Sequence, residues 1–264
     1  MFSTLRDFLH FPVKNSVRPF LRSQGPSAAW RSPRHELATV QGDKWSNVKR
    51  MSKFLNNRLP PGLGMDVPSL RRAGAILFVG VGQFAFFFAL AEIYYPGYDV
   101  STQTISDLGA TCVGSVCKFV QPSSDMFNVS IVLLGVALLL TGYFLWKGSG
   151  SKALTLFEGL AGIGCMGVGT FNESYGGAHA FFSALTFFSI GIQALLVFKV
   201  AKAPFYYFSA AAGVITLAAT LLYGTDTYLG LGQGGMERMI VYPVLINGLA
   251  LGGYMMALGD ALPR

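Results

Sequence analysis

The stretch MFNVSIVLLGVALLLTGYFLW, residues 126–146, decides the class of this chain because it runs for 21 residues without a charged side chain. A helix needs about 20 mostly apolar residues to cross the roughly 30 Å hydrocarbon core of a membrane. Further apolar stretches of this length lie at residues 75–95, 153–171, 179–198, 204–223 and 239–258. The sequence therefore predicts an all-α integral membrane protein, a bundle of six transmembrane helices.

Composition supports this prediction and locates the basic charge. Hydrophobic residues make up 52% of the 264 positions and charged residues 12%, whereas about a quarter of a soluble domain is charged. Residues 1–73 hold 13 Lys and Arg against 4 Asp and Glu, while residues 74–264 hold 7 against 9. Because the basic charge lies outside the segment that can bury a core, the pattern excludes a basic nucleic-acid-binding fold.

Basic residues also predict the orientation of the bundle. The tail and the connections that would share its side carry 18 of the 20 Lys and Arg residues, and only Lys118 and Arg238 fall on the other side. By the positive-inside rule, both termini are expected in the cytoplasm. The longer connections, residues 96–125 and 224–238, then lie outside, where we expect function because long loops commonly carry it.

The region 1–73 is predicted to be a basic, proline-containing disordered tail. It holds no apolar run long enough to insert into a membrane. Its composition also fits an organelle transit peptide, and a further alternative is an upstream extension if translation begins at Met51 or Met65 rather than Met1. The expected location of the domain 74–264 is the cell membrane, or an organelle membrane if the tail is a transit peptide.

Two cysteines in the first outer connection are candidates for a disulfide bond. Cys112 and Cys117 lie in the sequence Cys-Val-Gly-Ser-Val-Cys, on the side where oxidation is possible. The loop lacks the further ligands that zinc needs, so no metal site and no cofactor are predicted. Cys165 lies within a span and is expected to pack.

Polar residues at the outer rim supply the parts of an acid–base or nucleophilic site. Carboxylate, imidazole and hydroxyl groups together can perform such chemistry, and the catalytic candidates are His179, Asp107, Glu173 and Ser106. The alternative for His179 is a helix-start residue with a hydrogen-bond partner. For Ser106 and Asp107 it is a turn or a helix cap.

Ligand-binding candidates follow from polar groups at or near membrane depth, where an unpaired charge costs several kcal/mol. They are Glu92, Asn128, Glu158, Asn172, Ser183, Gln193, Glu237 and Arg238. Glu92 could instead serve at the interface, and Glu237 and Arg238 could form a surface charge pair of little energetic value. Hydroxyls and glycines within the spans are expected mainly to pack helices.

Several short motifs resemble those of the family named domain of unknown function 998. They are Tyr95-Pro96-Gly97-Tyr98, Ile105-Ser106-Asp107-Leu108-Gly109, Phe127-Asn128, His179, Gly235-Met236-Glu237-Arg238 and Tyr242-Pro243. The resemblance covers about residues 74–259 and leaves the tail outside. It implies a polytopic membrane protein with six helices and no assigned activity.

Three functions remain open at this stage. The first is binding or transport of a small solute or lipid through a site at the outer face. The second is a structural or assembly component whose outer loops contact another membrane protein or a further copy of the chain. The third is a membrane-embedded lipid hydrolase that uses His179 with outer carboxylates, so whether the protein is an enzyme stays undecided. A nucleotide-binding loop is lacking.

Overall fold

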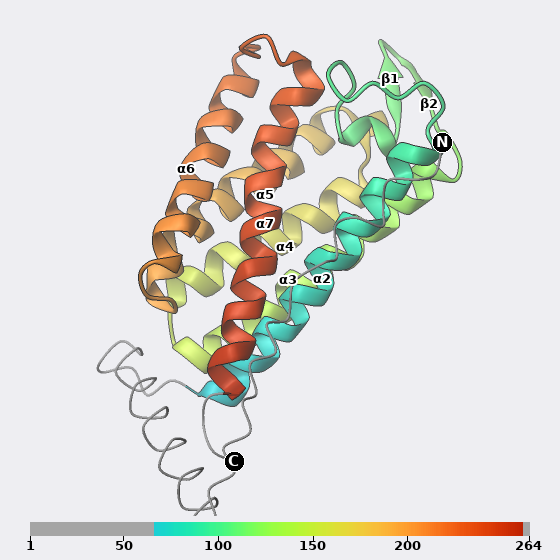
Figure 1. Ribbon diagram of the computed structural model, residues 1–264. Coiled ribbons are helices and arrows are strands. Elements are labelled where there is room, and N and C mark those ends of the chain that lie inside the picture. Colours follow the sequence, from blue (N-terminus) through green and yellow to red (C-terminus); the bar gives the residue numbers. More distant parts are fainter. Residues whose placement is uncertain (1–65, 261–264) are drawn as a thin grey trace, which may run out of the picture. The chain divides into compact units, whose positions relative to one another are not determined.

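A computed structural model describes residues 66–260 and shows an all-α fold with six long apolar helices (Figure 1). The helices are α2 (Val67–Tyr94), α3 (Ser123–Ser149), α4 (Lys152–Thr170), α5 (Gly177–Leu195), α6 (Phe205–Gly224) and α7 (Gly232–Asp260). Each is long and apolar enough to cross a membrane. The predicted six-helix fold is confirmed, while the tail up to residue 65 and the alternative start sites lie outside the described residues.

Helix α2 begins eight residues before the predicted span. It starts at Val67, with Pro68 in the first turn, so residues 67–73 are helical rather than part of the tail. Proline favours this position because its fixed φ suits a helix and its missing N–H has no partner there in any case. Apolarity alone could not find this start, since Arg71 and Arg72 follow it.

The six helices form a closed ring in which each packs against the next and α7 packs against α2 (Figure 1). Glycines allow the close approaches. A Cβ on Gly135 of α3 would lie 2.6 Å from the carbonyl oxygen of Gly162 on α4, and one on Gly74 of α2 would lie 2.6 Å from that of Gly252 on α7. Small residues serve this purpose in membrane helices, where backbones gain from close packing.

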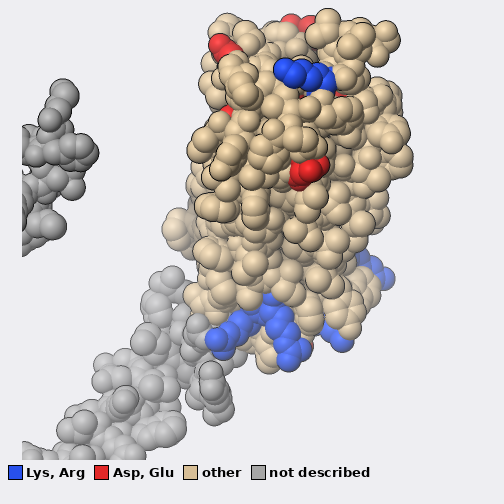
Figure 2. Space-filling view, turned by 90° about the vertical axis from the view of Figure 1, so that its right-hand side faces the viewer, with Lys and Arg blue, Asp and Glu red and all other residues tan. Residues whose placement is uncertain are grey.

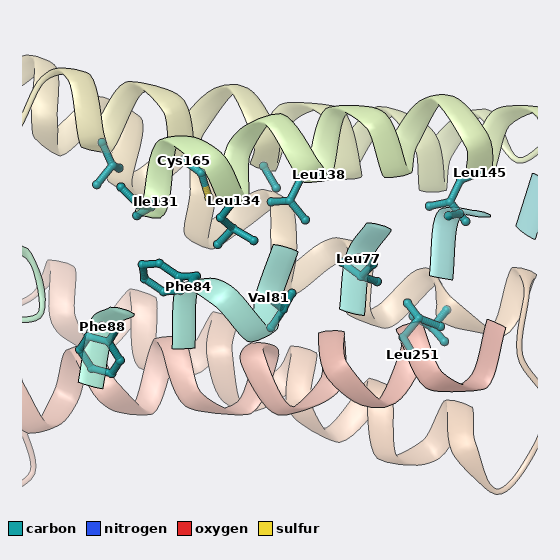
Figure 3. Close-up of a cluster of buried hydrophobic side chains, with 14 of the residues drawn as sticks. Leu77, Val81, Phe84, Phe88, Ile131, Leu134, Leu138, Leu145, Cys165 and Leu251 are labelled. Atoms are coloured by element: carbon teal, nitrogen blue, oxygen red, sulfur yellow. The ribbon is translucent and has the colours of Figure 1, made fainter. Parts of the chain in front are cut away.

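Buried apolar side chains from several helices fill much of the space within the ring. Figure 3 shows Leu77, Val81 and Phe84 of α2 facing the α3 residues Leu134 and Leu138. These side chains are at most 6% exposed. The core therefore runs along α2 and α3, and polar groups within it stand out as exceptions.

Charged side chains gather at the two ends of the bundle. Figure 2 shows most of the visible Lys and Arg at one end and most of the visible Asp and Glu toward the other end, where one basic group also lies. We call the end that carries residues 95–122, 171–176 and 225–231 the outer end, after the predicted orientation. The outer end holds the short helices η1 (Ser106–Leu108) and η2 (Glu173–Tyr175) and the hairpin of strands β1 (Thr111–Val113) and β2 (Val116–Lys118). We call the opposite end the inner end, and the short helix η3 (Leu196–Lys199) lies there.

Candidate functional site

The outer loop between α2 and β1 is fastened to α7 through Glu237. The main-chain N–H of Ile105 donates a hydrogen bond to Glu237 Oε2, and the Ser106 hydroxyl donates to Glu237 Oε1 at 3.0 Å. Glu237 is 4% exposed. The start of η1 is therefore held by a buried carboxylate on a helix 131 positions further along the chain.

Arg238, the next residue of α7, holds the earlier part of the same loop. Its Nη1 donates to the carbonyls of Val100 (2.9 Å) and Gln103 (3.2 Å), and its Nη2 lies 2.5 Å from Glu92 Oε1 and 2.8 Å from the Tyr98 hydroxyl. Arg238 is 7% exposed. Interpreting Glu237 and Arg238 as a surface charge pair is therefore wrong, because the loop covers both side chains.

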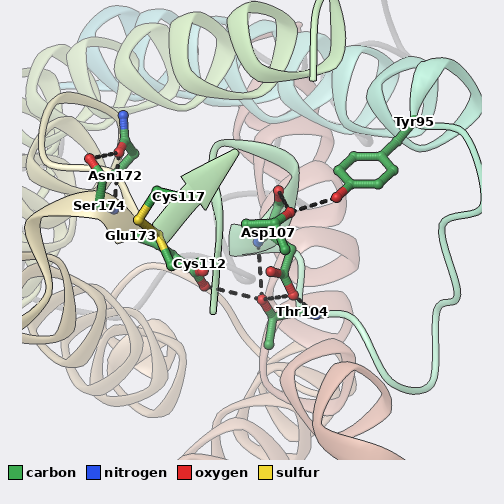
Figure 4. The surroundings of a disulfide bond; sticks show 9 residues. Tyr95, Thr104, Asp107, Cys112, Cys117, Asn172, Glu173 and Ser174 are labelled. Atoms are coloured by element: carbon green, nitrogen blue, oxygen red, sulfur yellow. Dashed lines mark hydrogen bonds between the residues drawn. A yellow bond between two sulfur atoms is a disulfide. The ribbon is translucent and has the colours of Figure 1, made fainter. Parts of the chain in front are cut away.

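A second hydrogen-bonded cluster joins Thr104, Asp107 and Glu173 (Figure 4). The Thr104 N–H and hydroxyl lie 2.7 Å and 2.9 Å from Asp107 Oδ2, and the same hydroxyl lies 3.2 Å from Glu173 Oε1. Burial, with the nearby charges of Asp107 and Glu237, raises the pKa of Glu173 to about 8. Glu173 therefore holds a proton at neutral pH, which relieves repulsion among three neighbouring carboxyl groups.

The β1–β2 hairpin lies next to this cluster and carries a disulfide bond between Cys112 and Cys117 (Figure 4). The two cysteines pair directly across the antiparallel strands. The Tyr95 hydroxyl lies 2.7 Å from the Thr111 hydroxyl and so ties the end of α2 to β1.

His179 occupies the first turn of α5 and is 8% exposed. Its Nδ1 lies 2.8 Å from the carbonyl oxygen of Phe171. Because a carbonyl can only accept, Nδ1 must carry the proton, and the neutral ring then offers Nε2 as an acceptor. In the described part of the chain, no hydrogen bond joins His179 to a carboxylate or a hydroxyl.

An outer cavity of about 490 Å³ lies between α5 and α6. Its polar lining comprises Ser106, Glu173, His179, Ser183, Thr220, Tyr223, Thr225 and Glu237. Its apolar lining includes Ala180, Ala184, Phe187, Phe188 and Leu221. The cavity therefore has a polar wall from the outer loops and helix ends and an apolar wall along the two helices.

A narrower central cavity of about 80 Å³ lies within the ring and is lined by α2, α3, α4, α5 and α7. Its polar lining includes Glu158, Gln193 and Asn247, each at most 2% exposed. The two cavities share Ser106, Ser183, Phe187 and Glu237 as lining residues. The central cavity thus adjoins the outer one.

The structure brings some predicted site residues together and separates others. Ser106, Glu173, His179, Ser183 and Glu237 meet at the outer cavity, whereas Glu158 and Gln193 line the central cavity. The remaining candidates have local partners: Glu92 pairs with Arg238, Asp107 binds Thr104, Asn128 donates to the Gly109 carbonyl, and Asn172 accepts from Ser174.

Sequence reasoning missed Thr104 and Asn247. Thr104 links two carboxylates, but a threonine before a turn carries no distinctive signal. Asn247 lies in the apolar run of α7. A polar amide side chain within such a run could have identified it as a candidate site residue. Between residues 66 and 260, no group of three His, Cys, Asp or Glu residues is placed to hold a metal ion.

Six apolar helices around an apolar core that holds a few buried polar side chains define a multi-pass membrane protein. The chain belongs to the family described as protein of unknown function (DUF998), whose profile matches residues 78–253. The resemblance seen in the sequence motifs is thereby confirmed. No curated protein and no solved structure matches the chain.

Proposed function

We propose that the protein binds an amphiphile with a cationic or hydroxyl-bearing head in the outer cavity. The observation that carries this proposal is the division of that cavity into a polar wall and an apolar wall. Drug-sized ligands are held in pockets of this kind, mostly apolar with a few convergent polar groups.

The charges of the polar wall select the head group. Glu237 is a carboxylate that accepts from Ile105 and Ser106, Glu173 is protonated and neutral at neutral pH, and the described lining of the outer cavity contains no Lys or Arg. Arg238 is directed away by its bonds to Glu92 and the loop carbonyls. Ser183 Oγ has no hydrogen-bond partner among the described residues. An amine or a hydroxyl can donate to these acceptors, whereas an anionic head would be repelled.

The apolar wall suits an acyl or alkyl chain. Ala180, Ala184 and Phe188 recur every fourth residue along α5 and are exposed at the side of the bundle. Leu221 of α6, 61% exposed, lines the cavity with them. Since the sides of a six-helix bundle meet lipid, an amphiphile can reach the cavity laterally with its chain still in the membrane.

Native mass spectrometry of the full chain tests this proposal with three probes of equal chain length. Dodecylamine is expected to bind best, dodecanol less well and dodecanoate least. Ala184→Trp should fill the apolar wall and abolish binding, while Ala218→Trp, an exposed position on α6 outside the lining, should not. Equal binding of all three probes, or binding unaffected by Ala184→Trp, would contradict the proposal.

A second candidate, an assembly component, is favoured by the tip of the β1–β2 hairpin. Val113 and Val116 are 80% and 74% exposed there, at the outer end. A stoichiometric second polypeptide that is lost on Val113→Ser with Val116→Ser would support this function. Hydrolysis has less support, because His179 bonds a main-chain carbonyl and is not paired with a hydroxyl among the described residues.

A further inference from the structure

Glu158 is a carboxyl group buried inside the ring. It lies six residues after the start of α4 and is 0% exposed. Neither carboxylate oxygen accepts a hydrogen bond that satisfies normal geometry within residues 66–260. A buried carboxylate left in this condition costs several kcal/mol, so the fold must supply a compensating group or a ligand.

Polar groups from two other helices face the same cavity. Asn247 of α7 is 2% exposed, and its Oδ1 has no donor in the described part of the chain. Gln193 of α5, also 2% exposed, lies beside the Glu158 carboxyl group. Carboxylate and amide oxygens from α4, α5 and α7 therefore converge on one small space.

The lining of the central cavity provides no positive charge. Its only charged side chains among the described residues are Glu158 and Glu237. Glu237 is stabilised by the Ile105 N–H and the Ser106 hydroxyl. Glu158 has the neutral Gln193 side chain beside it but, among the described residues that line the cavity, no cation that compensates its charge.

Within residues 66–260, the elements packed around Glu158 bring no other base or cation toward it. Helix α3 presents Gly142, whose added Cβ would lie 3.8 Å from that of Glu158, and α2 presents apolar side chains. On α4, the buried thiol of Cys165 interacts with Glu158, and Lys152 lies at the exposed start of the helix. On η3, the Lys199 ammonium lies 4.8 Å from the exposed ring of Phe198 and so faces outward.

We propose that Glu158, with Gln193 and Asn247, binds a monovalent cation, either Na⁺ or a proton. The cavity volume of about 80 Å³ admits a few water molecules or one ion but no amphiphile. A single positive charge neutralises the carboxylate, and the amide oxygens replace part of the hydration shell. Ser183 and Glu237, which line both cavities, mark the route from the outer cavity.

The test measures charge displacement by the full chain reconstituted in liposomes on a solid-supported membrane. A Na⁺ jump at constant pH and a pH jump without Na⁺ are applied separately, with no amphiphile present. A transient current after the Na⁺ jump identifies Na⁺ as the bound cation, and a transient current after the pH jump identifies a proton. Absence of current in both, from folded protein, overturns the proposal.

Variants assign the current to the site. Glu158→Gln should abolish it, whereas Asp125→Asn, which neutralises an exposed acidic residue at the start of α3, should leave it unchanged. Glu158→Asp should still give the current, but only at higher cation concentrations. Asn247→Leu should behave in the same way. Because Asn247→Leu keeps the carboxylate, it tests the site if Glu158→Gln fails to fold. A wild-type current from Glu158→Gln would refute the assignment.

Failure here is distinguishable from failure of the proposed amphiphile site. Glu158 does not line the outer cavity, so Glu158→Gln should still bind dodecylamine. Conversely, Ala184→Trp should lose dodecylamine and keep the transient current. Each result addresses one site alone.

Discussion

Arg238 and Glu92 are 146 positions apart in the sequence, yet Arg238 Nη2 lies 2.5 Å from Glu92 Oε1 at the outer end of the bundle. The pair joins the last turns of α2 to the first turns of α7. Its guanidinium also binds two carbonyls of the loop that follows α2. One side chain thus fixes a helix pair and the loop above it.

Arg238→Ala is expected to destabilise the protein by about 3 to 5 kcal/mol, because it leaves a partly buried Glu92 carboxylate unpaired and frees the loop. The loss should be visible as a lower midpoint of thermal unfolding in detergent. Lys147→Ala is the control, since Lys147 is exposed at the inner end and only overlies the Tyr143 ring. Equal midpoints for both variants would contradict the role given to Arg238.

Replacing glycine by alanine is expected to have opposite effects on the free energy of unfolding at two positions of α4. A Cβ on Gly164 would lie 2.8 Å from the Thr186 amide nitrogen on α5 and closer still to its hydroxyl, whereas one on Gly159 meets nothing within 4 Å. Gly164→Ala should therefore cost about 1 to 3 kcal/mol through overpacking. Gly159→Ala should be neutral or stabilise by up to about 1 kcal/mol through higher helix propensity. Thermal unfolding of the two variants side by side measures both.

The raised pKa of Glu173 predicts that the free energy of unfolding falls as the pH rises. Its folded-state pKa of about 8 lies above the ordinary value of 4.5. The folded state therefore binds more protons between these values, and the stabilising contribution, complete below pH 4.5, is lost as pH rises through 8. The free energy of unfolding should fall by an amount on the order of 2 kcal/mol. One pKa unit corresponds to about 1.4 kcal/mol, and the partial exposure of Glu173 reduces the effect of the full pKa shift.

Thermal unfolding between about pH 5 and about pH 9 measures this effect. Glu173→Gln should show a shallower decline than the wild type. Asp125→Asn serves as the matched control because Asp125 is exposed. An identical slope in Glu173→Gln would show that Glu173 is ionised throughout.

Loss of the disulfide should loosen the hairpin and leave the helices intact. Cys112 and Cys117 are only five positions apart, so the entropy that the bond removes from the unfolded chain corresponds to roughly 2 kcal/mol. Cys112→Ser with Cys117→Ser should increase amide hydrogen exchange in residues 109–120. Cys165→Ser is the control, and faster exchange across α2 or α7 would disagree with a local role.

The predicted orientation is testable by labelling single cysteines with a reagent that does not cross membranes. In a background without the native cysteines, Ser174→Cys at the outer end should react in intact cells or organelles, and Lys152→Cys at the inner end should react only after permeabilisation. Both positions are exposed. The reverse pattern would place the outer cavity in the cytoplasm.

The number of helices could be predicted from the sequence because apolar length is a local property. Helix starts were less accessible: α2 begins at Val67, since charged residues can continue a helix beyond the apolar core. Asn172 was predicted as a ligand-binding candidate, and the structure shows it capping η2, where it accepts bonds from Ser174.

The site could be predicted only in its parts. His179, Glu173 and Glu237 were candidates by residue type, but their meeting at one cavity depends on how the ring closes. The predicted span 153–171 places Glu158 near its inner end, but hydrophobic patterning did not reveal which helices are neighbours, so it could not bring Glu158, Gln193 and Asn247 to one cavity. It also could not show that Arg238 is held by main-chain carbonyls, because such partners leave no mark on the sequence.

Helix α6 packs against α5 and α7 but contributes no residue to the lining of the central cavity. Substitutions on its cavity-facing side, such as at Leu221, can therefore change the size of the outer cavity and leave the surroundings of Glu158 as they are. For engineering, α6 is the helix on which to alter the proposed amphiphile site while retaining the surroundings of Glu158.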